Sequence, residues 1–293
     1  MKQNNKILAG LALIVLALIW SYNWVVTKSV LRYVGALDFT ALRCALGTLL
    51  LVALLPLLGR PLQPPPWRPV LWISLFQTVG MTVLSQLALV SGDVGKTAVL
   101  VYTMPFWMIL LTILFLHEKP TVPQYLAAMV AAFGLVLVVQ PWQWHGSLSS
   151  SLLATASGLS WAASAVIAKR AFRHQTVDLL SLVTWQMLLG TLMLSILAIA
   201  THHTPIVWSS YMLLALAYNA VLATALGWTL WLFILRTLPA GIAGISTLMI
   251  PVMSVLWAWW LLNERPNHAE GGGIALILLA LALLGMPGPR NRK

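Results

Sequence analysis

The stretch LWAWWLLNERP at residues 256–266 has a shorter parallel, TILFLHEKP, at residues 112–120. Each is a run of apolar residues that ends in a glutamate, a basic residue and a proline, with the glutamates at Glu264 and Glu118. The chain contains only six acidic residues, so chance poorly explains why two of them share this setting. The parallel indicates that one half of the chain repeats the other.

The composition indicates a protein that lies in a lipid bilayer. Hydrophobic residues make up 60% of the 293 positions, charged residues only 8%, and the mean hydropathy is +0.90, whereas a soluble domain carries about 25% charged residues. The apolar runs reach the roughly 20 residues that a transmembrane helix needs, and they lack the polar–apolar alternation of barrel strands. Because a bilayer admits only helices and closed barrels, we predict an all-α membrane protein.

Ten apolar segments predict ten transmembrane helices. The connections between them are short, and one is a proline-rich loop at residues 59–69. The first segment follows basic residues, as in a signal peptide, but its apolar run is long and no cleavage motif ends it, so we expect an uncleaved span. The predicted spans are residues 7–26, 37–58, 69–90, 96–116, 122–140, 148–169, 179–200, 207–234, 240–262 and 269–287.

The basic residues predict the orientation of these spans. With the N-terminus inside, twelve of the 17 Lys and Arg residues fall on the inner side, four fall on the outer side, and Arg43 lies within a span. Because Lys and Arg collect in cytoplasmic loops, we expect both termini in the cytoplasm and the protein in the cell inner membrane. The same bias accounts for the net charge of +11, and we predict no nucleic-acid partner.

Further parallels extend the repeat. They are Pro105 with Pro251, each thirteen residues before its glutamate, WSYNWVVTK at 20–28 with WAASAVIAK at 161–169, and RCALGTL at 43–49 with QMLLGTL at 186–192. We therefore divide the chain into two five-helix units, residues 1–143 and 144–293. Because five is odd, the second unit enters the membrane from the opposite side, an inverted arrangement that many secondary transporters use for alternating access.

These features resemble the drug/metabolite transporter superfamily, and within it the EamA-type exporters. The resemblance rests on WSYNWVVTK in the first span, on the proline and glutamate motifs of spans four and nine, and on the ten-span layout, and it covers nearly the whole chain. It implies export of small organic metabolites, such as amino acids or related amphipathic or aromatic compounds, through a cavity between the halves. It does not identify the substrate.

Other functions stay open at this point: a membrane channel, a membrane-embedded sensor or scaffold, and an integral membrane enzyme. An enzyme would need clustered His, Asp or Glu at membrane depth, and a sensor would favour large loops or an appended domain; the sequence has neither. An inverted repeat with two intramembrane prolines favours a carrier over a channel. We predict a transporter that is not an enzyme, binds no metal or cofactor, takes a small-molecule substrate, and is a monomer or loose homodimer in the lipid bilayer.

Polar and aromatic residues on the span faces are the candidates for substrate binding. Asn23 shares a helix face with Trp20 and Trp24, and an amide in hydrocarbon should face the bundle or a wet cavity. The alternative is that such residues only pack and hydrogen-bond between helices. The candidate substrate-binding residues are Trp20, Asn23, Trp24, Gln77, Tyr102, Trp161, Ser164, Tyr218 and Asn219.

A second group of residues has predicted gating or structural roles. Pro105 and Pro251 should kink their helices. Glu118 and Glu264 follow helix ends, where they can tie helices together in a charge network or latch a gate. Arg43 lies about 10 Å into its span, from the rise of 1.5 Å per residue, where it can snorkel to the interface or act on the substrate. No carboxylate lies at mid-span, so we predict transport that needs no large proton gradient.

Residues near helix ends carry structural predictions. Lys28 and Lys169 should favour the helix dipole and anchor at lipid headgroups. Asn267 and Glu270 should form a reciprocal cap at the start of the last span. The glycines at 271–273 should permit close packing of two helices.

Overall fold

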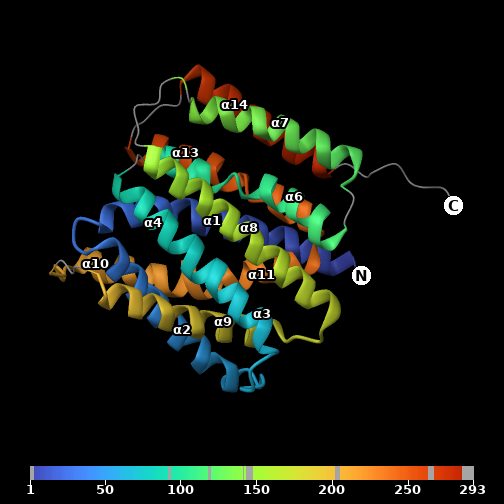
Figure 1. Ribbon diagram of the computed structural model, residues 1–293. Helices are drawn as coiled ribbons and strands as arrows, with labels where there is room; N and C mark the ends of the chain where they lie inside the picture. The colour runs from blue at the N-terminus through green and yellow to red at the C-terminus, as the bar shows by residue number, and fades with distance from the viewer. Residues whose placement is uncertain are drawn as a thin grey trace.

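The computed structural model describes residues 3–91, 94–117, 120–140, 142, 148–201, 205–262 and 267–285. In this part of the chain every regular element is helical, and Figure 1 shows the helices packed side by side as a bundle. In chain order, the helices are α1 (Gln3–Val30); α2 (Ala36–Leu57); α3, η1 and α4 (Trp67–Ile73, Ser74–Met81 and Thr82–Ser91); α5 and α6 (Val94–Val101 and Met104–Leu116); α7 (Val122–Val139); α8 (Leu148–His174); α9 (Leu179–Ile199); α10, η3 and α11 (Ser210–Tyr218, Asn219–Leu226 and Gly227–Thr237); α12 and α13 (Ala240–Ser246 and Met249–Leu262); and α14 (His268–Gly285).

Grouped end to end, the described helices form ten spans, which agree with the spans predicted from the sequence. Seven are long and apolar enough to cross a membrane by length and composition, and Val122–Val138, Ala240–Ser254 and His268–Leu283 are shorter apolar helices. The predicted fold class is confirmed. The chain is an all-α, multi-pass membrane protein whose ten transmembrane helices form two inverted five-helix repeats.

The two repeats interrupt their helices at equivalent places. The third span of each contains a π-helical segment, η1 in the first repeat and η3 in the second. The fourth span of each is broken by a two-residue turn, at residues 102–103 and at residues 247–248. These turns come just before Pro105 and Pro251. A proline has no N–H for the carbonyl four residues earlier and clashes with it, so an interruption ahead of each proline is expected.

The packing within the bundle is reciprocal between the repeats. Helix α1 packs against α11 and α13, and its counterpart α8 packs against α4 and α6. Helix α2 packs on η3, and its counterpart α9 packs on η1. The remaining counterparts pack on each other, α2 on α9 and α7 on α14, the latter pair at the top of Figure 1. This pattern is what a pseudo-two-fold axis between the repeats produces.

Glycines allow the spans to approach closely across that axis. A Cβ atom on Gly190 of α9 would lie 2.4 Å from the Thr78 Cβ in η1. A Cβ atom on Gly47 of α2 would lie 2.9 Å from the Thr224 Cγ2 in η3. Gly47 and Gly190 are counterparts in the repeat, so the same close contact between the second span and a π-helical segment is made twice.

Two further contacts join counterpart helices to each other. The hydroxyls of Thr48 and Thr191 lie 3.0 Å apart in a buried hydrogen bond between α2 and α9. A Cβ atom on Gly273 would lie 2.5 Å from the carbonyl oxygen of Gly134, so α14 and α7 pack with almost no space between their backbones. The prediction of close packing at 271–273 is therefore confirmed at Gly273.

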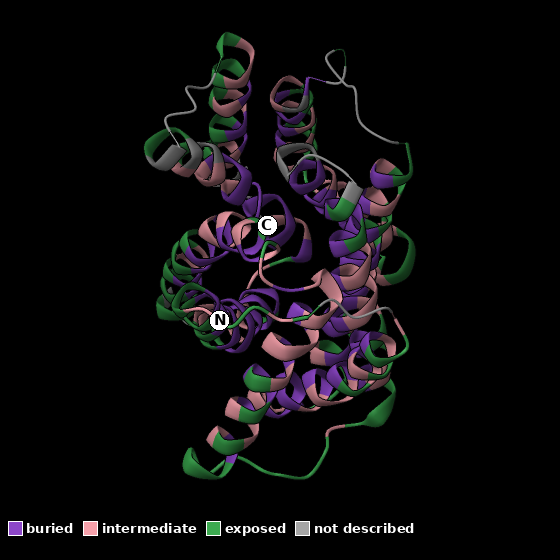
Figure 2. Cartoon of the chain, turned by 90° about the vertical axis from the view of Figure 1, so that its left-hand side faces the viewer, coloured by how far each residue is buried: buried purple, intermediate pink, exposed green. Residues whose placement is uncertain are grey.

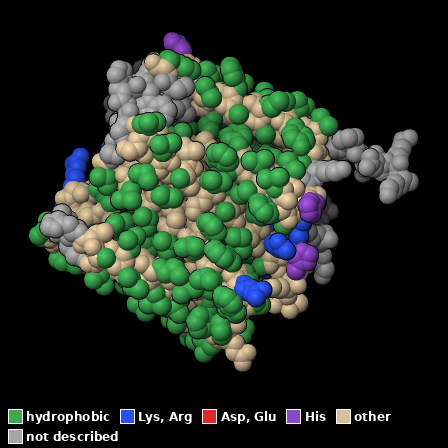
Figure 3. Space-filling model, in the orientation of Figure 1, with side chains coloured by type: hydrophobic (Ala, Val, Ile, Leu, Met, Phe, Trp, Pro, Cys, Tyr) green, Lys and Arg blue, Asp and Glu red, His purple; other side chains and the backbone are tan. Residues whose placement is uncertain are grey.

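The outer surface of the bundle is apolar, as contact with lipid requires. Figure 3 shows hydrophobic side chains over the middle of the bundle, with Lys, Arg and His near its ends, and Figure 2 shows buried residues turned inward and exposed ones outward. Large apolar side chains are well exposed there, with Leu49, Leu214 and Trp260 at 64%, 71% and 76%. In a soluble protein such a surface would promote association, but in a bilayer it faces acyl chains.

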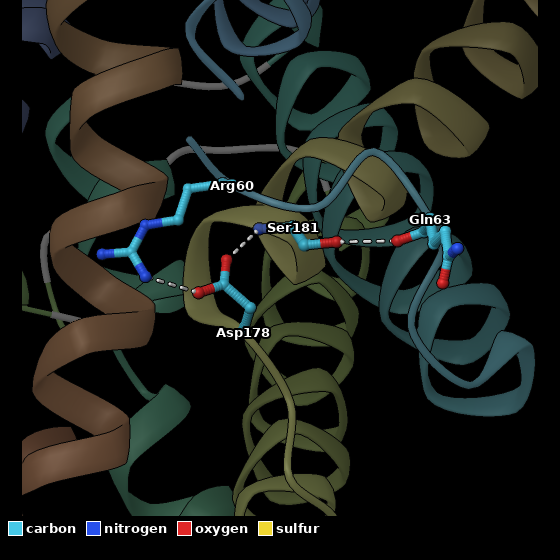
Figure 4. Close-up of polar contacts among 4 residues, drawn as sticks. All are labelled: Arg60, Gln63, Asp178 and Ser181. Carbon is cyan, nitrogen blue, oxygen red and sulfur yellow. Dashed lines mark hydrogen bonds and ion pairs between the residues drawn. The ribbon is translucent and has the colours of Figure 1, made fainter. Parts of the chain in front are cut away.

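Polar contacts hold the loop after α2 to the start of α9 (Figure 4). Arg60 Nη1 lies 3.2 Å from Asp178 Oδ2. Asp178 is the N-cap residue of α9, because its Oδ1 accepts a 2.9 Å hydrogen bond from the backbone N–H of Ser181. The Ser181 hydroxyl donates to the Gln63 carbonyl at 3.3 Å. Arg60 is 55% exposed, so its ion pair contributes at most about 1 kcal/mol.

The start of α14 has the reciprocal cap that the sequence predicts. The backbone N–H of Asn267 donates to Glu270 Oε2 at 2.8 Å, and the backbone N–H of Glu270 donates to Asn267 Oδ1 at 3.0 Å. Gln140 Nε2 donates to the same Asn267 Oδ1 at 3.0 Å, which ties the end of α7 to this cap. The first two bonds satisfy backbone N–H groups that the start of a helix would otherwise leave without a partner.

The prediction that Lys169 anchors at lipid headgroups is wrong. Lys169 lies within α8 and is buried, and its Nζ donates to the carbonyl oxygens of Leu235 at 2.7 Å and Leu238 at 2.5 Å. These carbonyls end α11, where the last C=O groups have no donor within the helix. The ammonium group supplies that donor. Its counterpart Lys28 is exposed.

Candidate functional site

A cavity of about 70 Å³ lies where the two repeats meet. Its walls come from α1, α2, η1, α4 and the turn after α5 in the first repeat, and from α8, η3 and α11 in the second. The lining residues are Trp20, Asn23, Trp24, Thr27, Arg43, Met81, Thr82, Ser85, Gln86, Leu89, Tyr102, Trp161, Ala223 and Trp228.

The π-helical segments position the first span of each repeat against this cavity. A π-helical turn changes the i→i−4 bonding of the chain, and such turns recur at functional sites. Here their carbonyl groups accept hydrogen bonds from other helices. Trp20 Nε1 of α1 donates to the Ala223 carbonyl of η3 at 3.0 Å. Ser160 Oγ of α8 donates to the Phe76 carbonyl of η1 at 2.7 Å. The two first spans are thus fixed to opposite third spans.

Five aromatic side chains from both repeats form a connected wall. The ring centroids of Trp20 lie 5.5 Å from those of Trp161 and 4.9 Å from those of Trp228. Tyr102 lies 5.8 Å from Trp161 and 6.3 Å from Trp24, whose Nε1 donates to the Tyr102 hydroxyl at 3.4 Å. All four pairs are edge-to-face, a geometry worth about 0.5–1.5 kcal/mol per pair beyond area burial. This wall is therefore largely aromatic, with each ring packed edge-on against a neighbour.

Several polar atoms of the cavity are buried without a protein partner. Arg43 Nη1 donates to Thr224 Oγ1 at 3.2 Å, but Arg43 Nε has no acceptor among the described residues. The amide oxygens Asn23 Oδ1 and Gln86 Oε1 have no donor there. Buried polar groups are usually paired, because leaving one unpaired costs about 1–3 kcal/mol. These three atoms can therefore gain from a bound solute.

Most of the predicted substrate-binding residues are brought together in this cavity. Trp20, Asn23, Trp24, Tyr102 and Trp161 all line it. They come from α1, the turn after α5, and α8. The repeat mates Trp20 and Trp161 meet each other there, as expected for counterparts at a pseudo-two-fold axis.

Four of the predicted residues lie outside the lining. Ser164 Oγ donates to the Trp161 carbonyl in its own helix at 2.7 Å, and Asn219 Nδ2 donates to the Ala215 carbonyl at 3.1 Å. The Tyr218 hydroxyl donates to the Ile19 carbonyl at 2.7 Å, so it joins α10 to α1. Gln77 is fully buried in η1, and neither of its amide atoms has a partner among the described residues. Their contact with a substrate stays a prediction.

Thr82, Ser85, Leu89 and Ala223 are among the lining residues that the sequence analysis missed. The first three lie on one face of α4 together with Gln86, at helical spacing. That spacing was a usable signal. Ala223 has no such signal, because its contribution is a backbone carbonyl in η3 whose exposure to Trp20 depends on the fold.

The candidate gating residues are only partly within the described structure. Glu118 and Glu264 lie outside the described residues, so their predicted role stays a prediction. Pro105 frees the carbonyl of Val101, four residues earlier. A Cβ atom on Gly158 of α8 would lie 2.7 Å from that carbonyl oxygen. The break in the fourth span is therefore in close contact with the first span of the other repeat.

The side chains around the cavity are of kinds that bind small organic molecules. They provide an aromatic wall, hydroxyls, two amides and one guanidinium. In the described residues, no group of three or more His, Cys, Asp or Glu could hold a metal ion. A mostly apolar cavity with a few oriented polar groups is typical of a small-molecule site.

The comparison with known protein families agrees with this architecture. The EamA-like transporter family matches the chain twice, at residues 7–140 and 148–286. The chain belongs to the EamA-like transporter family. The two matches correspond to the two halves of the bundle, and each includes five of its spans.

Individual relatives also cover almost the whole chain. An uncharacterized transporter, YoaV, of Bacillus subtilis (strain 168) is 26% identical over 87% of this chain and 89% of its own length. A "probable amino-acid metabolite efflux pump" of Escherichia coli (strain K12) is 23% identical over 93% of both chains. A solved structure titled "Crystal structure of protein" has the same fold, with a TM-score of 0.79 at 19% identity and coverage of 94% and 95%. The EamA-like protein described here is therefore a transporter of small metabolites.

Proposed function

We propose that this EamA-like protein exports small organic metabolites, amino acids or related amphipathic or aromatic compounds, across the cell inner membrane by alternating access. The observation that carries the proposal is the cavity at the junction of the repeats. Its aromatic wall combines Trp20, Trp24 and Tyr102 of the first repeat with Trp161 and Trp228 of the second. A solute held there contacts both halves, so its binding can be coupled to their relative movement.

The cavity must widen for such a solute to bind. Its volume of about 70 Å³ is below the roughly 300–1,000 Å³ of typical small-molecule pockets. A rocking motion of one repeat against the other opens one end of the cavity at a time. The turns at residues 102–103 and 247–248 are places where the backbone can absorb such a motion, and Tyr102 joins the first of them to the aromatic wall.

The orientation that we propose places both termini in the cytoplasm. Helix α1 begins and α14 ends at the same end of the bundle (Figure 1). The basic residues favour the cytoplasmic side for that end. In this orientation the two repeats face opposite sides of the membrane, and a monomer contains a complete cavity.

Exchange in reconstituted vesicles tests the proposal. The purified protein is placed in liposomes loaded with one unlabelled solute from a panel of amino acids and aromatic metabolites, and uptake of the same labelled solute is followed. We expect uptake driven by exchange for at least one class of solute. Protein-free liposomes give the background, and Leu214→Ala, which changes a lipid-facing side chain, is a matched variant control. Well-folded protein that exchanges no solute of the panel above background would overturn the proposal.

A further inference from the structure

Arg43 is a half-buried cation beside the cavity. It is the eighth residue of α2, about 10 Å along the helix from its start, given a rise of 1.5 Å per residue. Its side chain lines the cavity, and Nη1 donates to Thr224 Oγ1 at 3.2 Å. Nε is buried and has no acceptor among the described residues. The guanidinium therefore keeps donors that the protein itself does not use.

This arrangement is costly unless another group completes it. An arginine stays charged at any physiological pH and has five N–H donors. A charged group at membrane depth is expensive, and such residues face a cavity or a partner and are usually functional. The partner that the described structure shows is a neutral hydroxyl, that of Thr224. The positive charge of Arg43 thus favours a bound solute that carries an anionic group.

In the second repeat, the position equivalent to Arg43 holds an uncharged residue that makes the same contact between helices. Gln186 is the counterpart of Arg43, and Thr78 is the counterpart of Thr224. Thr78 Oγ1 donates to Gln186 Oε1 at 2.8 Å, so the bond between the second span and the opposite π-helical segment is made there by a neutral amide. Gln186 does not line the cavity. Holding the helices together therefore requires no positive charge, and the charge of Arg43 is left for another role.

We propose that the Arg43 guanidinium binds a carboxylate of the transported solute and so makes the carrier selective for carboxylate-bearing compounds. The inference rests on the proposed function. A carboxylate can accept from Nε and a neighbouring N–H of the planar fork at once, a geometry that lysine cannot provide. Trp24 and Tyr102 are placed to contact the apolar part of the same solute, and Asn23 Oδ1 can accept from a donor group on it.

The test compares solutes that differ only in the carboxyl group. Exchange and binding are measured for phenylalanine, phenylalaninamide and phenethylamine with the parent protein and with Arg43→Gln. Arg43→Gln copies the residue of the second repeat, so the bond to Thr224 and the melting temperature should be kept. We expect the parent to prefer phenylalanine, and Arg43→Gln to lose about tenfold to a hundredfold in phenylalanine affinity, as the strength of hydrogen bonds to charged groups implies. Arg43→Lys should keep only part of the preference.

Gln186→Ala is the matched control. It removes the mirrored bond to Thr78 without changing the cavity lining, so it should lower the melting temperature and leave the preference for phenylalanine intact.

If the parent exchanges phenylalanine but shows no preference over the amide and amine, or if Arg43→Gln binds phenylalanine as the parent does, the inference is overturned while the proposed function stands. If Arg43→Gln does not fold, an unchanged preference in Arg43→Lys overturns it instead. If the parent exchanges no solute at all, the proposed function fails and this inference fails with it.

Discussion

The close contact of Gly190 with Thr78 leads to a prediction of sizeable destabilisation by a single methyl group. In Gly190→Ala the new Cβ would lie 2.4 Å from Thr78 Cβ and 2.6 Å from its Cγ2, whereas carbon atoms normally approach to about 3.5–4.0 Å. The two spans must therefore move apart by about 1 Å. Overpacking of this kind costs about 1–3 kcal/mol, and weakening the bond from Thr78 to Gln186 adds about 1 kcal/mol.

Part of that cost is offset by the higher helix propensity of alanine. A substitution at a second glycine, Gly10, measures this offset. Alanine is favoured over glycine in a helix by about 1 kcal/mol, which leaves a net destabilisation of roughly 1–3 kcal/mol for Gly190→Ala. Gly10 of α1 has no atom within 4 Å of an added Cβ, so Gly10→Ala should show the favourable propensity alone. Thermal unfolding of both purified variants in one detergent, followed by tryptophan fluorescence, gives the comparison. If Gly190→Ala unfolded at or above the temperature of Gly10→Ala, the reasoning about the interface would be refuted.

Four further predictions concern function and topology. Asn23→Ala should lower solute affinity about three- to tenfold, from the loss of one hydrogen bond, with a melting temperature near that of the parent, because Asn23 Oδ1 has no protein partner to lose; loss of stability with normal transport would identify the residue as a helix contact only. Trp24→Ala should enlarge the cavity and shift the preference in a size-graded series of solutes towards larger members, and an unchanged ranking would contradict this. Reporter fusions should place both termini in the cytoplasm, and an external signal from either end would show the orientation to be wrong. Exchange in proteoliposomes should survive dissipation of the proton gradient, because no carboxylate lies at mid-span in the sequence; abolished exchange would reject this.

The sequence was sufficient to predict the spans and the repeat, because both depend on local properties. Runs of apolar residues determine where a helix can lie in a bilayer, and Pro105 and Pro251 mark the interrupted fourth spans because a proline cannot donate a backbone hydrogen bond. The π-helical segments η1 and η3 were not predictable in this way. Neither contains a proline, and their carbonyls pair with Ser160 and Trp20, which are distant in sequence.

The reliance on regular helical spacing also explains which of the cavity residues the sequence predicted. Asn23 and Trp24 lie on a regular α-helix, so helical spacing placed them correctly on the face of Trp20 that lines the cavity. Gln77 and Asn219 lie within π-helical segments, where the spacing of side chains around the helix differs from that of an α-helix. Regular α-helical spacing therefore does not determine which way these two side chains face. The role of Lys169 could not be predicted because it depends on a tertiary contact. The end of α11 packs beside α8, and its carbonyls accept hydrogen bonds from the Lys169 ammonium group.

The most direct test of the central claim is the accessibility of the cavity from the two sides of the membrane. Cys44 is the single cysteine of the chain and is buried, so Ser85→Cys in a Cys44→Ala background places one reactive thiol in the cavity lining. A membrane-impermeant thiol reagent is applied to one side of oriented vesicles at a time, with and without a transported solute. Alternating access predicts modification from either side and a ratio of the two rates that the solute changes. A thiol that reacts from only one side, whatever solute is present, would contradict it.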